Sequence, residues 1–355
     1  MNLKRVTINT ALPQRPKGRI LIIYTGGTFG MTYDNDGVLI PFDFSLIMEH
    51  LPTLKNLALE LTVISFDTPI DSSNISPEHW QVLAKIIYQN YETHDGFVVL
   101  HGTDTMAYTA SALSFMLEGL AKPVVFTGAQ LPITEARSDA RENLITALDF
   151  ASAKMNGKPL VPEVCIYFDY ELLRGNRSKK VESMQFDAFD SGNYPPLAKA
   201  GVKIDYNFSV IRSIPNGSKL TLRTSLDNNI SVLKLFPGIP ASTVDAILQT
   251  KPLKAVIIET YGSGNAPTDA CLLKALKSAL DRGVIVLNIS QCSGGMVIQG
   301  KYETSRELQQ IGVIGGADMT TEAAVTKLML LLGEHPPEKV KELLVKNIAG
   351  ELTPS

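Results

Sequence analysis

The sequence has few of the residues that form disulfide frameworks and zinc sites. Three of its 355 residues are cysteines, at positions 165, 271 and 292. The number is odd and no Cys-x-x-Cys pair occurs, which argues against both a disulfide scaffold and a structural zinc site. We therefore expect a protein of a reducing compartment that binds no metal.

Long apolar runs and long basic blocks are also missing. The apolar runs, such as residues 20–24, are far shorter than the roughly 20 residues that a membrane helix needs. The N-terminal segment is polar, is broken by prolines and lacks the apolar core of a signal peptide. A net charge of −3 argues against a phosphate-binding surface. The sequence favours a soluble, cytoplasmic protein with no nucleic-acid partner and no membrane partner.

Short β-branched runs recur along the first half of the chain, each followed by glycine or a small polar residue and then by a helical pattern. We expect strands over 19–24, 61–66, 96–102, 123–128 and 163–168, and helices over 76–92, 104–119 and 138–154. Continuous apolar strands that alternate with helices predict a mostly parallel sheet flanked by helices. In such sheets ligands bind beyond the carboxyl ends of the strands.

The chain changes character after this region, with short polar breaks and a PNGSK segment at 215–219 that is typical of a hairpin turn. A second alternating pattern follows, with strands inside 253–265 and 283–292 and helices over 268–282, 320–332 and 337–348. We expect an α/β protein with three parts: an N-terminal catalytic α/β domain over 1–200, a linker over 201–230, and a smaller C-terminal α/β domain over 231–355.

Two of the expected strands end in threonines that could carry chemistry. In TGGT (25–28) the paired glycines allow a sharp turn, and Thr28 presents a hydroxyl. In HGTDT (101–105) the hydroxyl of Thr103 adjoins the carboxylate of Asp104. Taken singly, each motif is more often a capped start of a helix, and His101 is more often a structural histidine than a catalyst.

Two further polar segments follow strands in the same way. DSSN (71–74) offers Ser72 and Ser73, whose hydroxyls suit a carboxylate, and RGNRSKK (174–180) brings Lys179 and Lys180 near the end of the strand at 163–168. A solvated pair is the usual role of such lysines. The four segments together would supply a nucleophile, a base relay and two anchors for a zwitterion at one edge of the sheet.

With these motifs in view, the sequence resembles the bacterial type I, cytosolic L-asparaginases across nearly its whole length. TGGT and HGTDT, in this order and spacing, are specific together. The resemblance implies an N-terminal α/β domain with the catalytic centre, a smaller C-terminal α/β domain, a homodimer or dimer of dimers, and no cofactor. The matching segments are YTGGTFGM (24–31), PIDSSNISPEHW (69–80), HGTDTMAYTASALSFML (101–117), TGAQLPI (127–133), RSDARENLITALDFA (137–151), LLRGNRSKK (172–180), FDAF (186–189), YGSGNAP (261–267), VLNISQC (286–292), GVIGGADMTTEAAVTKL (312–328) and GELTP (350–354).

The resemblance also implies a role for each matching residue. Thr28 is implied as the nucleophile that accepts the acyl group, and Thr103, Asp104 and Lys180 as a second catalytic triad. The implied reaction is hydrolysis of L-asparagine to L-aspartate and ammonia through an acyl-enzyme.

The same resemblance implies the contacts of the substrate, L-asparagine. Ser72, with Asp71 nearby, is implied to bind its α-carboxylate, and Asp104 its α-ammonium. Asn265 resembles the asparagine that reaches the site of a neighbouring subunit.

Two positions depart from the family pattern. The lid tyrosine usually stands ten residues after the nucleophile, where this chain has Val38, so Tyr33 is the nearest possible lid residue. Some members bind a regulatory asparagine through an arginine where this chain has Glu259. A carboxylate lacks the donors that grip a substrate carboxylate, so we expect weak or absent cooperativity.

Other functions stay open at this point. A glutaminase or a mixed asparaginase-glutaminase would use the same fold, because a pocket discriminates one methylene by only about 1–3 kcal/mol. An enzyme acting on amidated tRNA would normally add a domain and a basic surface, neither of which is visible. A non-catalytic amino-acid-binding protein would keep Ser72 and Asp104 but would not need Thr28, Thr103 and Lys180.

Overall fold

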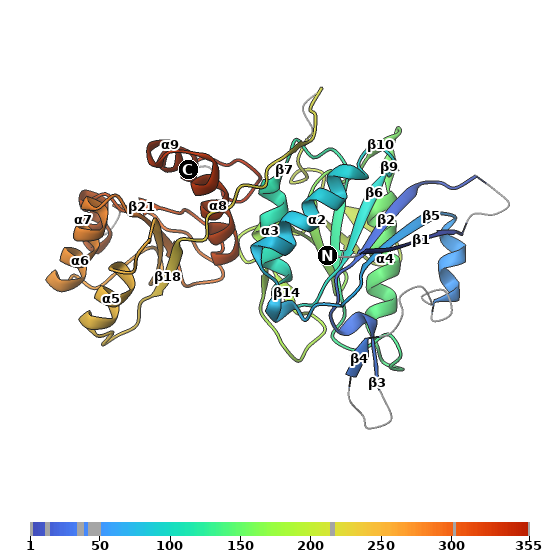
Figure 1. The fold of residues 1–355 in the computed structure, drawn as a ribbon, viewed down its shortest axis with the longest axis horizontal. Coiled ribbons are helices and arrows are strands. Elements are labelled where there is room, and N and C mark those ends of the chain that lie inside the picture. Colours follow the sequence, from blue (N-terminus) through green and yellow to red (C-terminus); the bar gives the residue numbers. More distant parts are fainter. Residues whose placement is uncertain are drawn as a thin grey trace. The chain divides into compact units, whose positions relative to one another are not determined.

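The computed structural model describes residues 3–10, 15–33, 39–41, 51–213, 217–300 and 303–353. The chain forms two compact units (Figure 1). Unit 1 comprises Met1–Asp190 and Pro195–Leu222, and unit 2 comprises Ser191–Tyr194 and Arg223–Ser355. The interval 201–230, which we expected to be a linker, contributes strands to unit 1 up to Leu222 and belongs to unit 2 from Arg223 onward.

Unit 1 is built on a nine-stranded sheet with the order β1-β5-β2-β6-β8-β11-β12-β15-β16. The five central strands are parallel, and antiparallel strands flank them on both sides. The expectation of a mostly parallel sheet therefore holds for the centre only, and the sheet as a whole is mixed. The strands are β1 (Leu3–Asn9), β2 (Arg19–Tyr24), β5 (Glu60–Phe66), β6 (Gly96–Leu100), β8 (Val124–Thr127), β11 (Val164–Phe168), β12 (Glu171–Arg174), β15 (Ala198–Ala200) and β16 (Ile204–Tyr206).

A two-residue turn begins the antiparallel part of the sheet beyond β11. After β11, Asp169 and Tyr170 both have positive φ, 44° and 67°, and the chain returns at once as the antiparallel strand β12. Positive φ at both central residues is the geometry of a tight hairpin turn, which usually takes Asn-Gly or Asp-Gly. An Asp-Tyr pair does not signal such a turn, and this is why the sequence did not predict a hairpin here.

In the described part of unit 1, three helices cover the sheet: α2 (Pro77–Gln89), α3 (Met106–Met116) and α4 (Ala140–Ser152). Figure 1 shows α2 and α3 on one face of the sheet and α4 on the other. Helices on both faces explain why β2 has no polar side, since residues 20–23 are fully buried. Helix α2 begins as its sequence predicts, with Ser76 as N-cap, Pro77 at the first position and a capping box to His79.

The order of the central strands indicates where a ligand would bind. β5 and β6 lie on opposite sides of β2, so the chain reverses its direction of travel across the sheet at β2. Tyr24 at the end of β2 pairs with Leu100 at the end of β6. Loops that leave two such strands diverge to opposite faces, and ligands of open α/β sheets bind between them at this switch point.

Unit 2 contains a four-stranded parallel sheet with the order β18-β19-β20-β21. Its apolar core includes Val256 and Ile258 of the sheet and Leu276 from a covering helix. The sequence predicted β19, β20, α6, α8 and α9, and it missed β18, α5 and α7. The elements are β18 (Ile230–Lys234), β19 (Ala255–Thr260), β20 (Ile285–Ser290), β21 (Ile314–Gly315), α5 (Ala241–Leu248), α6 (Ala270–Asp281), α7 (Glu303–Ile311), α8 (Thr321–Glu334) and α9 (Pro337–Leu344).

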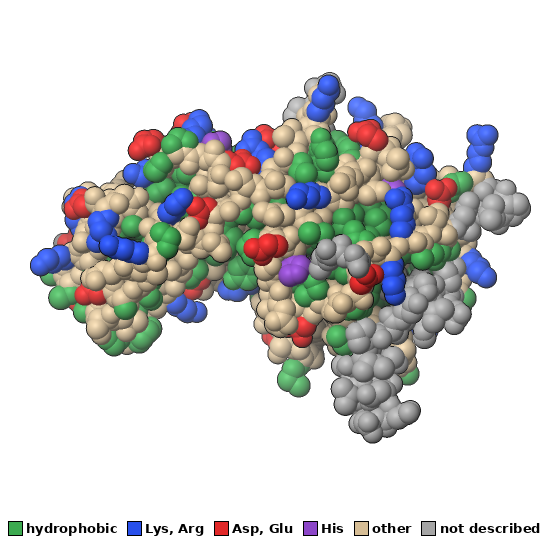
Figure 2. Space-filling view, viewed as in Figure 1, with side chains coloured by type: hydrophobic (Ala, Val, Ile, Leu, Met, Phe, Trp, Pro, Cys, Tyr) green, Lys and Arg blue, Asp and Glu red, His purple; other side chains and the backbone are tan. Residues whose placement is uncertain are grey.

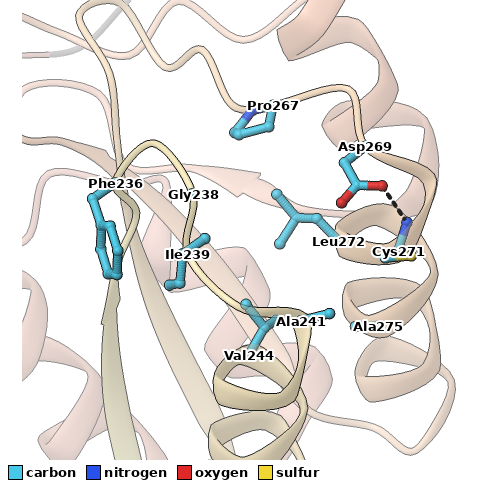
Figure 3. Close-up of a pocket in the computed structure, with 10 residues that line it drawn as sticks. All are labelled: Phe236, Gly238, Ile239, Ala241, Val244, Pro267, Asp269, Cys271, Leu272 and Ala275. Carbon is cyan, nitrogen blue, oxygen red and sulfur yellow. Dashed lines mark hydrogen bonds between the residues drawn. The ribbon is translucent and has the colours of Figure 1, made fainter.

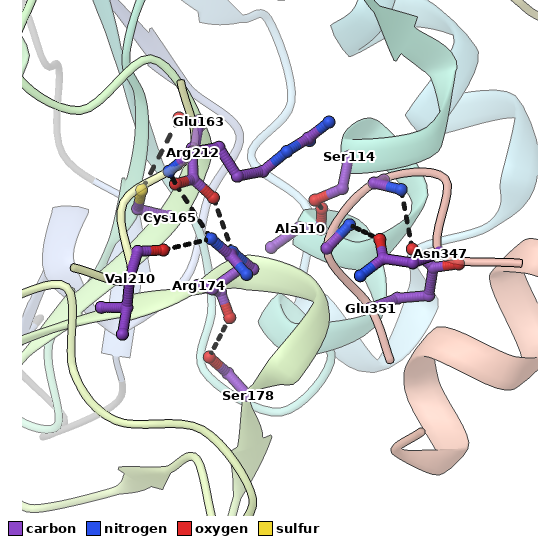
Figure 4. Close-up of polar contacts among 12 residues, drawn as sticks. Ala110, Ser114, Glu163, Cys165, Arg174, Ser178, Val210, Arg212, Asn347 and Glu351 are labelled. Atoms are coloured by element: carbon purple, nitrogen blue, oxygen red, sulfur yellow. Dashed lines mark hydrogen bonds and ion pairs between the residues drawn. The ribbon is translucent and has the colours of Figure 1, made fainter. Parts of the chain in front are cut away.

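A buried ion pair fixes the C-terminal segment of unit 2. Lys327 of α8 and Glu351 are both fully buried, with Nζ and Oε1 2.6 Å apart. The Glu351 carboxylate also accepts the N–H of Ala349 at 2.7 Å, and Asn347 donates to the carbonyl of Leu352 (Figure 4). Charges buried this deeply need such hydrogen bonds in addition to each other.

Short elements complete the description. Two-stranded pairs join β3 with β4, β7 with β17, β9 with β10, and β13 with β14. The expected hairpin turn at 215–219 lies partly outside the described residues. The remaining bounds are β3 (Met31–Tyr33), β4 (Leu39–Pro41), β7 (Leu117–Glu118), β9 (Lys154–Met155), β10 (Lys158–Pro159), β13 (Lys179–Lys180), β14 (Phe189–Asp190), β17 (Thr221–Leu222), and the 3-10 turns η1 (Thr28–Gly30), η3 (Pro52–Leu57), η4 (Ser72–Asn74) and η5 (Gly175–Arg177).

The surface carries charges of both signs. On the face shown in Figure 2, basic and acidic side chains are interspersed over both units. This mixing agrees with the near balance of 33 Lys and Arg against 36 Asp and Glu. Across the ranges that the structure describes, we find no helix with the length and apolarity to cross a membrane.

Candidate active site

Three loops meet at the switch point of unit 1, and two glycines allow them to touch. A Cβ on Gly27, which has φ +86°, would lie 2.5 Å from the Cα of Gly102. A Cβ on Gly102 would lie 2.6 Å from the Oγ of Ser72. No side chain fits at either glycine, so the backbone at Gly102 lies directly against the backbone of the loop after β2 and against the Ser72 side chain of the loop after β5. Thr28 and Thr103 each follow one of these glycines directly, which brings both threonines to the junction.

The loop that carries Thr28 is tied to its neighbours. Both the N–H and the hydroxyl of Thr25 donate to the carbonyl of Leu100 at 3.0 Å, and the carbonyl of Thr25 accepts the N–H of Ile70. Thr28 is half-buried and is the first residue of η1. Gly27 occupies the cap position of η1, so Thr28 is not the helix-capping threonine that TGGT alone would more often contain.

Thr103, Asp104 and Lys180 form one hydrogen-bonded cluster. The Nζ of Lys180 donates to the Oγ1 of Thr103 at 2.8 Å and to the Oδ1 of Asp104 at 2.7 Å. The side chain of Lys180 is 17% exposed and that of Asp104 is 62% exposed. The amine is therefore held between two oxygens, while the Asp104 carboxylate keeps an open side that can accept a cation from solution.

Lys180 reaches the cluster by a route that the sequence did not predict. We expected it to follow the carboxyl end of β11, but β12 runs back along β11, and Gly175 then packs against Ala110 of α3 and the carbonyl of Val164 at the start of β11. From there the chain passes through η5 to β13, whose Lys180 pairs with Phe189 of β14.

A buried ion pair anchors this route. Arg174 and Glu163 are 4% and 2% exposed, and the guanidinium grips the carboxylate with Nε–Oε2 2.6 Å and Nη2–Oε1 3.1 Å (Figure 4). The carbonyl of Arg174 accepts the hydroxyl of Ser178 at 2.7 Å. A bidentate pair fixes both position and orientation, so it defines where the segment that leads to Lys180 begins.

His101 is structural, as its position at a strand end suggested. Its Nδ1 donates to the carbonyl of Gly102 at 2.7 Å, and its Nε2 lies 3.0 Å from the hydroxyl of Thr109, which also accepts from Trp80. Burial lowers the pKa of His101 to about 4, against the opposing effect of its bond to the Gly102 carbonyl. A neutral, fully engaged imidazole holds the Gly102 turn and is no base for the substrate.

The loop after β5 presents Ser72. Asp71 caps η4 and accepts the N–H and hydroxyl of Ser73 at 2.9 and 2.8 Å. These two hydrogen bonds lower the pKa of Asp71, so it is ionised near neutral pH. Ser72 is 4% exposed with its Oγ against Gly102, and its carbonyl accepts the hydroxyl of Thr105 at 2.7 Å.

Tyr33, Val38 and Asn265 complete the set of predicted residues. Tyr33 ends β3, and residues 34–38, including Val38, are outside the described part of the chain. Asn265 belongs to unit 2, where it closes a turn after β19 by exchanging backbone hydrogen bonds with Tyr261 at 2.9 Å. One residue at the site was missed: Gln130, whose Oε1 accepts from Thr103 at 3.4 Å.

Unit 2 contains a cavity of about 160 Å³. It lies between α5 and α6, with Phe236 and Ile239 on one side and Leu272 on the other (Figure 3). Its walls are mostly apolar, and all of its lining residues belong to unit 2, whereas the threonines, Asp104 and Lys180 belong to unit 1.

In the part of the chain that the structure covers, no three His, Cys, Asp or Glu side chains form a group that could hold a metal ion.

Comparison with known proteins assigns a family. The family model described as "Asparaginase, N-terminal" matches residues 19–212, and "Glutaminase/Asparaginase C-terminal domain" matches residues 229–344. The chain is 42% identical to L-asparaginase 1 of Escherichia coli, over 95% of this chain and 99% of that one. A crystal structure of L-asparaginase I from Vibrio cholerae superimposes with a TM-score of 0.86 at 40% identity, and covers 95% of this chain and 99% of that one.

Relatives with other names share the same region. The human 60 kDa lysophospholipase is 41% identical over 96% of this chain, which spans 62% of that protein's length. A glutamyl-tRNA(Gln) amidotransferase component from Pyrococcus furiosus is 34% identical over 96% of this chain and 78% of its own. The two family models together cover most of the sequence, and the fold agrees with that of the solved asparaginase. This chain belongs to the asparaginase family and is an amidohydrolase.

Proposed function

We propose that this chain hydrolyses L-asparagine to L-aspartate and ammonia, with Thr28 as the nucleophile. The observation that supports the proposal is the hydrogen-bonded cluster of Thr103, Lys180 and Asp104. Thr103 directly follows Gly102, and Thr28 directly follows Gly27, which contacts Gly102. A hydroxyl nucleophile, a lysine in hydrogen-bond contact with a second hydroxyl, and an open carboxylate are the groups that amide hydrolysis of an amino acid needs.

The substrate is held by its two charges. The open carboxylate of Asp104 takes the α-ammonium, and the Ser72 hydroxyl, with Asp71 nearby, binds the α-carboxylate. Two anchors on different loops fix the direction of the side chain, so the amide carbon points at the Thr28 hydroxyl. Positioning of this kind supplies a large part of the rate enhancement of an enzyme.

Acylation joins the substrate to Thr28. The Oγ1 of Thr28 attacks the amide carbon, and its proton passes to the amine of Lys180 and from there to the leaving nitrogen. The carbon–nitrogen bond breaks with its electron pair on nitrogen, and ammonia departs from an aspartyl ester. The backbone N–H of Thr103 stabilises the oxyanion between these events, a contribution of roughly 3–4 kcal/mol for such a donor.

Deacylation uses the same groups in reverse order. A water beside Thr103 gives its proton to the amine of Lys180 and attacks the ester carbon. Thr28 recovers the proton as its oxygen leaves, and aspartate is released. A lysine can accept the proton only as the neutral amine, which ties activity to the protonation state of this cluster.

An ammonia-release assay on asparagine and on glutamine tests the proposal. We expect turnover of asparagine, with slower turnover of glutamine because the extra methylene displaces the amide carbon. Thr28→Ala should lower kcat by about 10⁴-fold or more with an unchanged circular dichroism spectrum. Thr243→Ala, an exposed threonine of α5, is the matched control and should retain full activity. Near-normal activity of Thr28→Ala would refute the nucleophile.

Assembly into oligomers belongs to the same proposal. We infer a homodimer or a dimer of dimers in which Asn265 of one subunit completes the site of another, and in which Tyr33 belongs to a lid over the nucleophile. Light scattering of the active protein measures the assembly directly. A fully active monomer would contradict the role of Asn265.

A further inference from the structure

Gln130 lies at the carboxyl edge of the sheet, three residues after the end of β8. Its backbone N–H donates to both carboxylate oxygens of Asp139, at 3.1 and 3.0 Å, and the N–H of Leu131 donates to the same carboxylate at 3.1 Å. Asn143 of α4 binds Asp139 at 3.1 Å as well. The main chain at Gln130 is therefore fixed to the start of α4, and its side chain projects from a rigid base.

The two ends of the Gln130 amide bind different loops. Its Nε2 donates to the carbonyl of Gln185 at 2.8 Å, and its Oε1 accepts from the hydroxyl of Thr103 at 3.4 Å. A backbone carbonyl can only accept, so the amide nitrogen must face Gln185 and the oxygen must face Thr103. The contact with Gln185 thus determines which atom Thr103 meets.

This orientation determines the direction of the Thr103 hydroxyl. Because Oε1 of Gln130 has no proton to give, the hydroxyl of Thr103 donates to it and turns a lone pair toward Lys180. The Nζ of Lys180 donates to that lone pair at 2.8 Å. One directional chain of hydrogen bonds therefore runs from Lys180 through Thr103 and Gln130 to the carbonyl of Gln185.

Gln185 lies in the loop that joins β13, which carries Lys180, to β14. Residues 181–185 of this loop are exposed. The N–H of Val181 donates to the carbonyl of Ala188 at 2.9 Å, which closes the base of the loop. The hydrogen bond from Gln130 to the carbonyl of Gln185 ties the outer part of the loop to the catalytic edge of the sheet.

We propose that Gln130 is a positioning residue, which holds the Thr103 hydroxyl so that a lone pair faces Lys180, and which ties this pair to the loop 181–188. The proposal rests on the proposed function of the same cluster. Gln130 acts through Thr103 and does not bind the substrate, so its loss should change the rate of the chemical steps and leave substrate affinity in place.

Two substitutions distinguish the two hydrogen bonds of the Gln130 amide. Gln130→Met removes both hydrogen bonds at similar volume, and Gln130→Glu keeps an acceptor toward Thr103 but loses the donor to Gln185. With asparagine as substrate, Gln130→Met should lower kcat about 5- to 10-fold, as expected for one hydrogen bond, with KM within about twofold of the unsubstituted protein. Gln130→Glu should retain more of kcat than Gln130→Met. Gln89→Met, an exposed glutamine at the end of α2, is the control.

Hydrogen exchange followed by mass spectrometry gives a readout that does not depend on activity. Both Gln130 variants should exchange faster in the peptide that covers 181–188, and Gln89→Met should not. A raised KM with unchanged kcat, equal loss of kcat in both Gln130 variants, or unchanged exchange in 181–188 would each overturn the proposal. Absence of asparagine turnover in the unsubstituted protein would refute the proposed function instead, and exchange would then still report on the loop.

Discussion

Replacing Lys180 with methionine separates catalysis from stability. The Nζ of Lys180 donates to Thr103 at 2.8 Å and to Asp104 at 2.7 Å, and the substitution removes both hydrogen bonds while it keeps most of the side-chain volume. A positioned acid–base group contributes about 10²- to 10⁴-fold to the rate. We therefore expect kcat for asparagine to fall by that factor.

The same substitution should cost little stability. The Asp104 side chain is 62% exposed, so water replaces the lost ion pair, and exposed pairs contribute only about 0–1 kcal/mol. In a unit of this size that corresponds to a change in Tm of no more than about 2–4 °C. Lys199→Met is the matched control, because it breaks an exposed ion pair with Glu171, also 2.7 Å long, away from the site.

Ammonia release and thermal unfolding, measured on the same preparations, give both numbers. The control variant should keep full activity. Retention of more than about a tenth of kcat by Lys180→Met would refute the assignment of the lysine as the proton acceptor. A loss of Tm far beyond the control would show that Lys180 is structural.

Three further predictions concern other parts of the chain. Glu163→Gln leaves the buried Arg174 guanidinium without its anion, so we expect the free energy of unfolding, measured in urea, to fall by about 3–5 kcal/mol. A decrease below about 1 kcal/mol would contradict the anchoring role of the pair. His101 has a folded-state pKa of about 4, below its ordinary value of about 6.5, so the unfolded chain binds the proton at a higher pH than the folded protein does. The neutral imidazole therefore stabilises the fold above pH ~6.5, and this contribution of up to about 3 kcal/mol is lost as the pH falls toward 4. The difference in free energy of unfolding between the unsubstituted protein and His101→Gln should shrink over that pH range. The carboxylate of Glu259 accepts the hydroxyl of Thr321 at 2.5 Å, and its side chain is 12% exposed. Because a carboxylate offers no donors to the carboxylate of a regulatory asparagine, we expect a hyperbolic dependence of rate on asparagine concentration. A sigmoidal curve with a second asparagine bound beside Glu259 would count against this.

The sequence predicted those parts of the fold whose burial leaves an apolar run in the sequence. β2, β6 and β8 were expected because a strand covered on both faces must be apolar, and apart from Arg19 at the start of β2 their residues are buried. β1 was missed because it lies at the edge of the sheet and residues 3–7 are exposed, so no apolar run marks it. α7, with the sequence ETSRELQQI, is too polar to signal a covering helix.

The candidate site divides in the same way. Thr28, Ser72 and Thr103 could be placed from sequence because each directly follows a predicted strand or its turn, and parallel strands end at one edge. The path of Lys180 could not, because it depends on the hairpin between β11 and β12 and on the Arg174–Glu163 pair. Gln130 stands in the segment TGAQ with no local signal of its role, since its partner Gln185 lies 55 residues away in the sequence. Long-range pairings of this kind leave no local pattern.

The central claim is that Thr28 and the Thr103–Lys180 pair face one amino acid held between Ser72 and Asp104. A crystal structure of the protein with bound L-aspartate tests it most directly. The claim predicts the α-carboxylate on Ser72, the α-ammonium on Asp104, and the side-chain carboxyl carbon about 3–3.5 Å from the Oγ1 of Thr28. Aspartate bound with its side chain directed away from Thr28, or bound at another place in the molecule, would contradict it.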